Sequence, residues 1–336
     1  MTPRILSGVQ PSGTLHLGNY FGAVQQHVEL AANAGGPLSA FYFIANLHTL
    51  TSVHDAERVR TLTRDVAVDY LALGLDPAKA TFFRQSDVPE VCELMWLLSC
   101  CVGKGLLERA HSYKDKVAKG LEPSMGLFNY PVLMAADILI YRSTVVPVGK
   151  DQQQHVEMTQ DMAQSFNAAF GREVFIRPEW RFSPAPVVPG VDGAKMSKSY
   201  NNTIPIFLPD KMTEAQAYKA FFASIKTDSK GVEEPKDPND TLMMLYRLLD
   251  AKQAEEFAPL YARGGVGYGE LKQRLHKAYI ARFAPFAEKR RAIVVDDAFV
   301  EGVLEEGARR ARGVAREVMA DARDAAGILV ARDTHS

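Results

Sequence analysis

The sequence predicts an α/β fold, with a parallel sheet in the first domain and a purely α-helical second domain. In about the first 200 of the 336 residues, short runs rich in β-branched and aromatic residues alternate with longer helical patterns. Such alternation is typical of βαβ units, which place helices on both faces of a parallel sheet. After residue 203 only helical patterns follow. We therefore expect domains at 1–202 and 203–336, with the last helix free to pack back on the first domain.

The strands and helices of the first domain follow in order along the chain. The runs expected to be strands are 4–9, 41–45, 81–83 and 144–148. The helical patterns, in which apolar residues recur every three or four positions, cover 55–73, 88–101, 125–141 and 151–170. In such sheets ligands bind beyond the carboxyl ends of the strands.

The second part of the chain has a different character. Residues 177–193 are rich in proline and glycine, so we expect a loop or linker there. Helical patterns then cover 215–225, 240–249, 269–283 and 296–326, with a polar loop at 227–238.

The composition is that of a globular protein. Apolar residues make up 47% and charged residues 24%, which excludes disordered and low-complexity classes. No apolar run reaches the length of a membrane span, and the N-terminus lacks the apolar segment of a secretory signal. With only three cysteines, we expect a cytoplasmic protein without a structural zinc site. The net charge of −1 means that a nucleic-acid partner would need a local basic patch.

The first turn of the chain, Gly8 to Tyr20, joins the first strand to its helix. Turns of this kind bind phosphates, because unpaired N–H groups and the helix dipole favour anions. The pattern is neither GxGxxG nor GxxxxGK[ST]. A plain turn with a surface histidine at His16 is the alternative, and the turn alone does not decide between the two.

The segment Lys195-Met196-Ser197-Lys198-Ser199 follows the proline-rich stretch. Two lysines three residues apart can hold a polyphosphate, because each ammonium acts as a point charge on phosphate oxygens. A solvated charged loop is the alternative for an arbitrary KxxK. The five-residue match, together with the first turn, favours phosphate binding.

Asp137 lies within a strongly apolar helical pattern, on nearly the same face as Tyr130, Met134 and Tyr141. A carboxylate among apolar residues is destabilising unless it has a partner. The alternatives are a helix-capping or a surface aspartate.

Together these motifs resemble a known family. His16-Leu17-Gly18-Asn19 resembles the HIGH signature of class I aminoacyl-tRNA synthetases, and residues 195–199 match their KMSKS signature at all five positions. The first turn, 134–139, 146–155 and 267–269 resemble the branch specific for tryptophan. Asn19 replaces the second histidine of HIGH, as this branch tolerates. The resemblance covers nearly the whole chain.

The resemblance implies a Rossmann-like nucleotide-binding domain, an α-helical anticodon-side domain and a two-step reaction. L-tryptophan and ATP form tryptophanyl-adenylate and pyrophosphate, and the tryptophanyl group then passes to the 3′ end of tRNA(Trp). The first step needs in-line positioning and charge neutralisation, because the attacking carboxylate is already ionised. The resemblance also implies a homodimer, no membrane partner, and Mg²⁺ that accompanies ATP without a dedicated protein site.

The resemblance assigns roles to named residues. Those expected to act in catalysis are His16, Asn19, Lys116, Lys195 and Lys198, with Lys114 and Lys119 as alternatives to Lys116. Those expected to bind ATP are Gln10, Pro11, Ser12, Gly18, Asn19, Gly149, Lys150, Asp151, Lys195, Met196, Ser197, Lys198 and Ser199. Those expected to bind tryptophan are Gly8, His48, Tyr130, Met134, Asp137, Val148 and Gln152, with Asp137 accepting a hydrogen bond from the indole N–H.

Some assignments have simpler alternatives. His48 could cap a turn at a strand end, and Gln152 could be polar surface. The arginines of 309–316 favour a solvated face paired with nearby glutamates over a contact with the tRNA backbone.

Three other functions fit parts of the pattern. A tyrosyl-tRNA synthetase would share the scaffold, but 134–139 argues against it. A regulatory paralogue that binds tryptophan or RNA without catalysis would not need His16, Lys195 and Lys198. A stand-alone nucleotidyltransferase would not need the long helical second half.

Overall fold

The computed structural model describes residues 4–118, 120, 122–149, 152–182, 187–209 and 211–328. Its centre is a sheet of parallel strands in the order β3-β2-β1-β4-β5. The strands are β1 (Ile5–Val9), β2 (Ala40–Ile44), β3 (Thr81–Arg84), β4 (Val145–Val148) and β5 (Glu179–Phe182). The predicted α/β fold class and the first four strands are confirmed.

The expectation of a loop over 177–193 is wrong at β5. This strand pairs with β4 over four residues. It lies at the edge of the sheet, with Glu179 and Arg181 exposed, so it lacks the apolar run that identified the buried strands. Short, charged strands are typical of sheet edges, and the prolines around this one obscured it.

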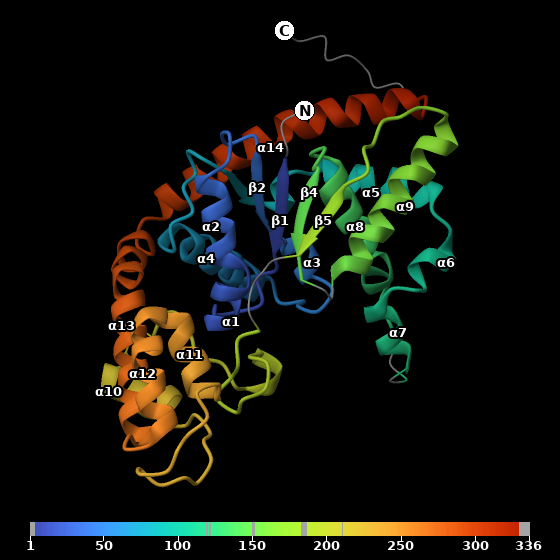
Figure 1. Ribbon diagram of the computed structural model, residues 1–336. Helices are drawn as coiled ribbons and strands as arrows, with labels where there is room; N and C mark the ends of the chain where they lie inside the picture. The colour runs from blue at the N-terminus through green and yellow to red at the C-terminus, as the bar shows by residue number, and fades with distance from the viewer. Residues whose placement is uncertain are drawn as a thin grey trace.

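Helices cover both faces of the sheet (Figure 1). On one face lie α1 (Leu17–Asn19), α2 (Gln25–Ala32) and α4 (Ala56–Ala72), and on the other α5 (Glu90–Cys101), α8 (Met125–Leu139) and α9 (Gln153–Phe170). The strand β2 serves both cores, because successive side chains point to opposite faces. Phe41 and Phe43 pack toward α5 and α8, whereas Tyr42 and Ile44 pack toward α2 and α4.

Side chains cap the N-termini of two of these helices, α4 and α8. The Asp55 carboxylate accepts from the backbone N–H of Arg58 at 2.8 Å, and Ser124 Oγ accepts from the N–H of Leu127 at 3.2 Å. Both satisfy a donor that the first helical turn leaves unpaired. They place α4 and α8 close to their predicted positions.

Short helices escaped prediction because few residues give no measurable periodicity. They are α3 (Asn46–Thr49), α6 (Lys104–Leu107) and α7 (His111–Ala118). Two of them carry residues of the predicted site, since α3 contains His48 and α7 contains Lys114 and Lys116.

The second half of the described chain is helical. It contains α10 (Glu214–Ala217), a π-helical turn at Tyr218–Phe222, α11 (Thr241–Leu249), α12 (Ala251–Arg263), α13 (Tyr268–Ile293) and α14 (Asp297–Ala325). The predictions missed α12 and ended α13 at residue 283. Both helices contain a proline, Pro259 and Pro285, and proline argues against a helix interior.

The last helix, α14, leaves the other helices and crosses the sheet domain against β3 and α5 (Figure 1). It approaches β3 so closely that a Cβ on Gly307 would lie 1.8 Å from the Phe82 carbonyl oxygen. Arg312 and Arg316 pair with Glu90 of α5 at 2.9 and 3.3 Å.

The arginines of 309–316 are therefore only partly the solvated face that we expected. Arg309 and Arg310 do pair with Glu306 of their own helix, but the other two reach across to α5. Among the described residues, no helix is both long and apolar enough to cross a membrane.

Candidate active site

A pocket lies where β1 and β4 separate in the middle of the sheet. β1 pairs with β2 along its whole length but shares only the Ile5–Val145 pair with β4. The chain order of the sheet reverses between these two strands, and open α/β sheets bind ligands at such a point. The pocket has a volume of about 510 Å³, which is typical of small-molecule sites.

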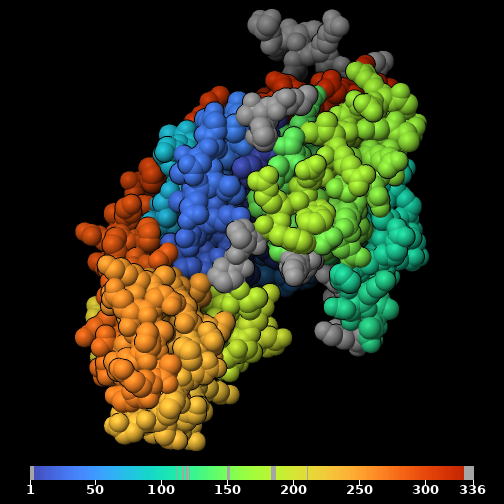
Figure 2. All heavy atoms as spheres, viewed as in Figure 1, coloured from blue at the N-terminus to red at the C-terminus, as the bar shows by residue number. Residues whose placement is uncertain are grey.

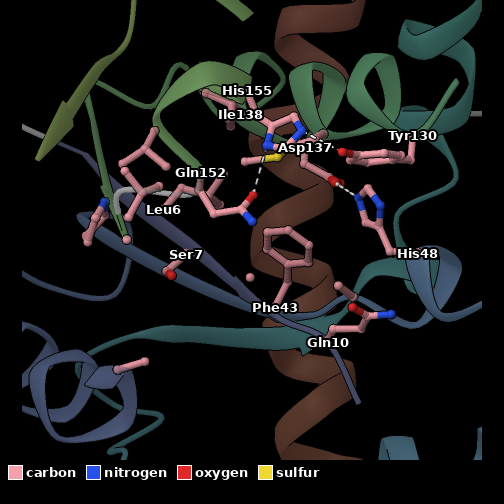
Figure 3. A pocket seen from close by; sticks show the side chains of 18 of the residues that line it. Leu6, Ser7, Gln10, Phe43, His48, Tyr130, Asp137, Ile138, Gln152 and His155 are labelled. Atoms are coloured by element: carbon pink, nitrogen blue, oxygen red, sulfur yellow. Dashed lines mark hydrogen bonds and ion pairs between the residues drawn. The ribbon is translucent and has the colours of Figure 1, made fainter. Parts of the chain in front are cut away.

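All the residues predicted to bind tryptophan line this one pocket: Gly8, His48, Tyr130, Met134, Asp137, Val148 and Gln152. They come from β1, α3, α8, β4 and the start of α9, segments far apart in the sequence. Figure 3 shows Asp137, His48 and Tyr130 on one side of the pocket, with Phe43 between them and β1. The structure thus brings the set together, and its role in binding tryptophan stays a prediction.

Asp137 is buried, 1% exposed, and neither caps a helix nor lies on the surface. Its carboxylate accepts hydrogen bonds from His48 Nε2 at 3.0 Å and from Gln85 Nε2 at 2.8 Å. Burial raises the pKa of Asp137, and the bonds from His48 and Gln85 act against that rise. A buried carboxylate aimed into a pocket is a candidate binding group, because its remaining acceptor capacity favours a ligand that donates.

Gln85 is the partner that the sequence did not reveal. It lies just after β3 and is 1% exposed. The only available signal was its place at the carboxyl end of a predicted strand, where ligands bind. The His48 ring is hydrogen-bonded to Asp137, so its side chain does not cap a turn.

A second chain of hydrogen bonds orders the pocket wall. Gln152 Oε1 accepts from His155 Nδ1 at 3.1 Å, and the Tyr130 hydroxyl lies 2.5 Å from His155 Nε2. In a neutral His155 ring with Nδ1 as donor, Nε2 accepts the hydrogen bond from the tyrosine hydroxyl. Gln152 is thus part of the pocket wall (Figure 3), not plain polar surface.

Gly8 is required by close packing. A Cβ at this position would lie 2.5 Å from Cζ of Phe43. The Phe43 ring also lines the pocket. Any larger residue at position 8 would therefore push this ring and reduce the space for a ligand.

The first signature (His16–Asn19) begins the helical segment after β1. His16 is buried, and its backbone N–H donates to the Asn19 side-chain oxygen at 3.1 Å. The alternative of a surface histidine is therefore wrong. Within the described part of the chain, His16 Nδ1 is buried without a hydrogen-bond partner, as expected of a group that awaits a ligand.

The second signature (Lys195–Ser199) lies directly against the first. The Gly18 N–H donates to the Met196 sulfur at 3.3 Å, and a Cβ on Gly18 would lie 3.4 Å from the Met196 Cβ. The backbone continues this contact, because Leu17 N–H donates to Ile204 O at 2.9 Å. Figure 2 shows the segment 187–209 bordering an open notch, with α7 on its far side.

The two lysines of the second signature differ in their surroundings. Lys195 is exposed, whereas Lys198 is half-buried, with its Nζ 3.4 Å from Ser12 Oγ. Burial, and then the charge of Lys198, lower the pKa of His16 to about 4. His16 is therefore neutral at physiological pH and can donate or accept beside a cation.

Asn202 shapes the second signature, and the sequence did not indicate it. Its buried amide donates to Asp192 Oδ1 at 2.7 Å and to the Lys195 carbonyl at 3.2 Å, and its oxygen accepts from the Ser197 N–H at 2.8 Å. One side chain therefore fixes the backbone on both sides of Met196.

The structure describes only some of the other residues predicted to bind ATP or to act in catalysis. Gln10 and Gly149 line the pocket, and Pro11 and Ser12 lie in the turn beside the second signature. Lys150, Asp151 and the side chain of Lys116 lie outside the described residues. The described part of the chain holds no group of three or more His, Cys, Asp or Glu side chains that could bind a metal ion.

Comparisons with known proteins show to which family the chain is similar. The family model for class I tRNA synthetases (W and Y) matches residues 1–284. The chain is 48% identical to a tryptophan–tRNA ligase of Fusobacterium nucleatum, over 97% of this chain and 98% of the relative. It is 49% identical to that of Rhodopirellula baltica, over 97% and 99%.

A solved structure is similar over nearly the same length. The tryptophanyl-tRNA synthetase from Campylobacter jejuni, in complex with ADP and tryptophan, superposes with a TM-score of 0.88 at 46% identity. The similarity covers 96% of this chain and 99% of that one.

Proposed function

Since the chain belongs to the class I tRNA synthetases for tryptophan and tyrosine, we propose that it attaches L-tryptophan to tRNA(Trp) with ATP as the energy source. One observation carries the proposal. The two signatures, 178 residues apart between Gly18 and Met196, meet in the fold beside a pocket that contains a buried carboxylate. The tryptophan–tRNA ligases at 48% and 49% identity favour tryptophan over tyrosine.

The first step joins tryptophan to AMP. A carboxylate oxygen of tryptophan attacks the α-phosphorus of ATP, and the bond from that phosphorus to the bridging oxygen breaks, so pyrophosphate leaves with the electron pair. No proton has to move. The protein's contribution is to align the reactants and to stabilise the charge that develops on the leaving group.

We assign the phosphates to the two signatures. The ammonium groups of Lys195 and Lys198 hold the leaving pyrophosphate, and the neutral His16 and Asn19 bond to ATP. The half-buried state of Lys198 strengthens its attraction to phosphate, because partial exclusion of water weakens screening. Mg²⁺ would accompany ATP and supply positive charge to its phosphates, with Lys195 and Lys198 as the chain's own cations for pyrophosphate.

We assign the tryptophan side chain to the pocket of Asp137. The indole N–H donates to this carboxylate while His48 and Gln85 hold it in place. A ligand that lacks the donor leaves a buried carboxylate short of a partner. Sites built around one such bond reject analogues without it by up to about 10⁴–10⁵.

In the second step, a hydroxyl of the terminal tRNA adenosine attacks the acyl carbon of the adenylate, and AMP leaves. We propose that residues 1–202 supply this chemistry and that 203–336 lie toward the anticodon. We also propose a cytoplasmic homodimer. Sedimentation at micromolar concentration tests the dimer, with a mass near 37.1 kDa as the result against it.

The test of the whole proposal is aminoacylation. Purified protein, ATP, Mg²⁺ and a tRNA(Trp) transcript should transfer labelled tryptophan to acid-insoluble RNA, and chelation of Mg²⁺ should stop the reaction. A transcript with the anticodon of another amino acid is the control. Absence of charging by folded protein would contradict the proposal.

A further inference from the structure

We propose that Tyr279, on α13 of the helical half, is a positioning residue for the second signature and thereby for adenylate formation. This inference rests on the proposed function and goes beyond it. The helical half would then contribute to the first chemical step, before any tRNA has bound.

The first observation is a hydrogen bond between distant segments. The Tyr279 hydroxyl is the donor, and it lies 3.0 Å from the carbonyl oxygens of both Pro205 and Ile206. Tyr279 is 2% exposed, and burial raises the pKa of its hydroxyl, so it stays a protonated donor throughout the physiological range. The ring packs against Phe222 and Phe283.

The second observation is what residues 204–206 hold. Leu17 N–H donates to Ile204 O at 2.9 Å, and Ile206 N–H donates to Leu15 O at 3.0 Å. Pro205 forms a bridge with His16. Residues 204–206 thus form a short antiparallel strip along the first signature. The Tyr279 hydroxyl is hydrogen-bonded to two carbonyl groups of this strip.

The third observation links the strip to the lysines. Asn202, two residues before Ile204, is bonded to the backbone of Lys195 and Ser197. The segment from Asn202 to Ile206 therefore connects Tyr279 to the second signature, is buried at Asn202, Ile204 and Ile206, and is hydrogen-bonded at each end. In the proposed mechanism, Lys195 and Lys198 bind pyrophosphate from a loop that is anchored through residues 202–206. If this anchor becomes more mobile, both lysines are in position for a smaller fraction of the time.

The proposed tryptophan pocket is held by other residues. Its carboxylate is fixed by His48 and Gln85 from α3 and the end of β3. We therefore expect a change at Tyr279 to affect the step in which pyrophosphate leaves and not the binding of tryptophan.

The chain offers a matched pair of variants for the test. Tyr279→Phe removes one hydroxyl and keeps the ring. Tyr246→Phe removes the hydroxyl of another tyrosine of the helical half, 1% exposed as a residue, which donates to Gln253 Oε1 at 3.3 Å and not to the strip. Both variants are compared with the unmodified chain in tryptophan-dependent ATP–pyrophosphate exchange and in melting temperature.

For Tyr279→Phe we expect kcat to fall roughly two- to tenfold, as for the loss of one net hydrogen bond. The KM for tryptophan should be unchanged, and single-turnover transfer from preformed adenylate to tRNA should keep its rate because pyrophosphate has already left. Tyr246→Phe should leave kcat unchanged. Equal kinetic effects of the two variants, or a loss confined to melting temperature, would overturn the inference.

A measurement that needs no activity separates this inference from the proposed function. Amide hydrogen exchange of a peptide covering 195–206 should become faster in Tyr279→Phe and stay unchanged in Tyr246→Phe. If the unmodified chain shows no pyrophosphate exchange, the proposed function fails while this result still decides whether Tyr279 fixes the loop. Equal protection in both variants would show that it does not.

Discussion

The substitution Asp137→Asn should separate binding from stability. The change keeps the size and shape of the side chain but replaces one acceptor oxygen by a donor NH₂ and removes the charge. In the pocket the carboxylate already serves His48 and Gln85. An asparagine has too few acceptors to satisfy both of these and an indole N–H.

The size of the effect follows from those contacts. A hydrogen bond to a charged group contributes about 1.5–3 kcal/mol, against about 0.5–1.5 kcal/mol for a neutral one. If the indole loses the charged acceptor altogether, kcat/KM for tryptophan should fall roughly ten- to a hundredfold. The KM for ATP should not change, since the phosphates meet other residues.

Stability should change much less than binding. Burial raises the pKa of Asp137, so the folded protein binds this proton more tightly than the unfolded chain does. The resulting stability is present in acid and is lost as the pH rises through the folded pKa. The neutral asparagine escapes that loss, which offsets the weakened hydrogen bonds. We therefore expect the free energy of unfolding at pH 7 to stay within about 1 kcal/mol of the unmodified value.

The assay is pyrophosphate exchange with tryptophan or ATP varied, together with denaturant unfolding. Asp69→Asn is the contrast, because Asp69 is also buried but pairs with Arg290 at 2.6 Å, away from the pocket. It should lower stability and leave the KM for tryptophan unchanged. Unchanged tryptophan kinetics in Asp137→Asn would remove this residue from the binding site, and a collapse of its stability would make its role structural.

Three further predictions concern other parts of the molecule. Lys195→Met and Lys198→Met should each lower kcat of pyrophosphate exchange by about 10²–10³ with the tryptophan KM unchanged; equal loss in KM would refute the assignment to pyrophosphate. Gly307→Ala should destabilise the fold by about 1–3 kcal/mol or more in denaturant unfolding, because its Cβ would meet β3. Gly313→Ala, on the same helix with open space around it, should be neutral or stabilising; similar losses in both would contradict the packing of α14. Burial lowers the pKa of His27 to about 4. The protein should therefore lose stability as the pH falls from 6.5 to 4, by about 3 kcal/mol at 1.36 kcal/mol for each pH unit. His27→Gln should lack this component of the pH dependence in unfolding curves, and parallel curves for the two proteins would argue against a neutral buried histidine.

The sequence allowed the architecture to be predicted where apolar patterns were long. Strands such as β2, buried on both faces, and helices such as α4 and α8 were close to their predicted bounds. β5 escaped because an exposed edge strand has no apolar run, and α12 escaped because a proline interrupts it. In each case the local pattern was weak and the tertiary position decided the structure.

The candidate site divides in the same way. The residues predicted from motifs, such as His16 and Lys198, were identified by their resemblance to the signatures of a known family, and the fold brings their segments into contact. Gln85, Asn202 and Tyr279 form hydrogen bonds between segments whose sequences carry no motif. A glutamine after a strand or a tyrosine in a helix carries no such signal until the partners are placed in space.

The most direct test of the central claim is ATP–pyrophosphate exchange with tryptophan, tyrosine, phenylalanine and no amino acid in parallel. We predict exchange with tryptophan alone. Exchange with tyrosine would contradict the assignment of the Asp137 pocket while leaving the two signatures in place. No exchange with any amino acid, from folded protein supplied with Mg²⁺, would contradict the activation chemistry itself and favour a regulatory paralogue.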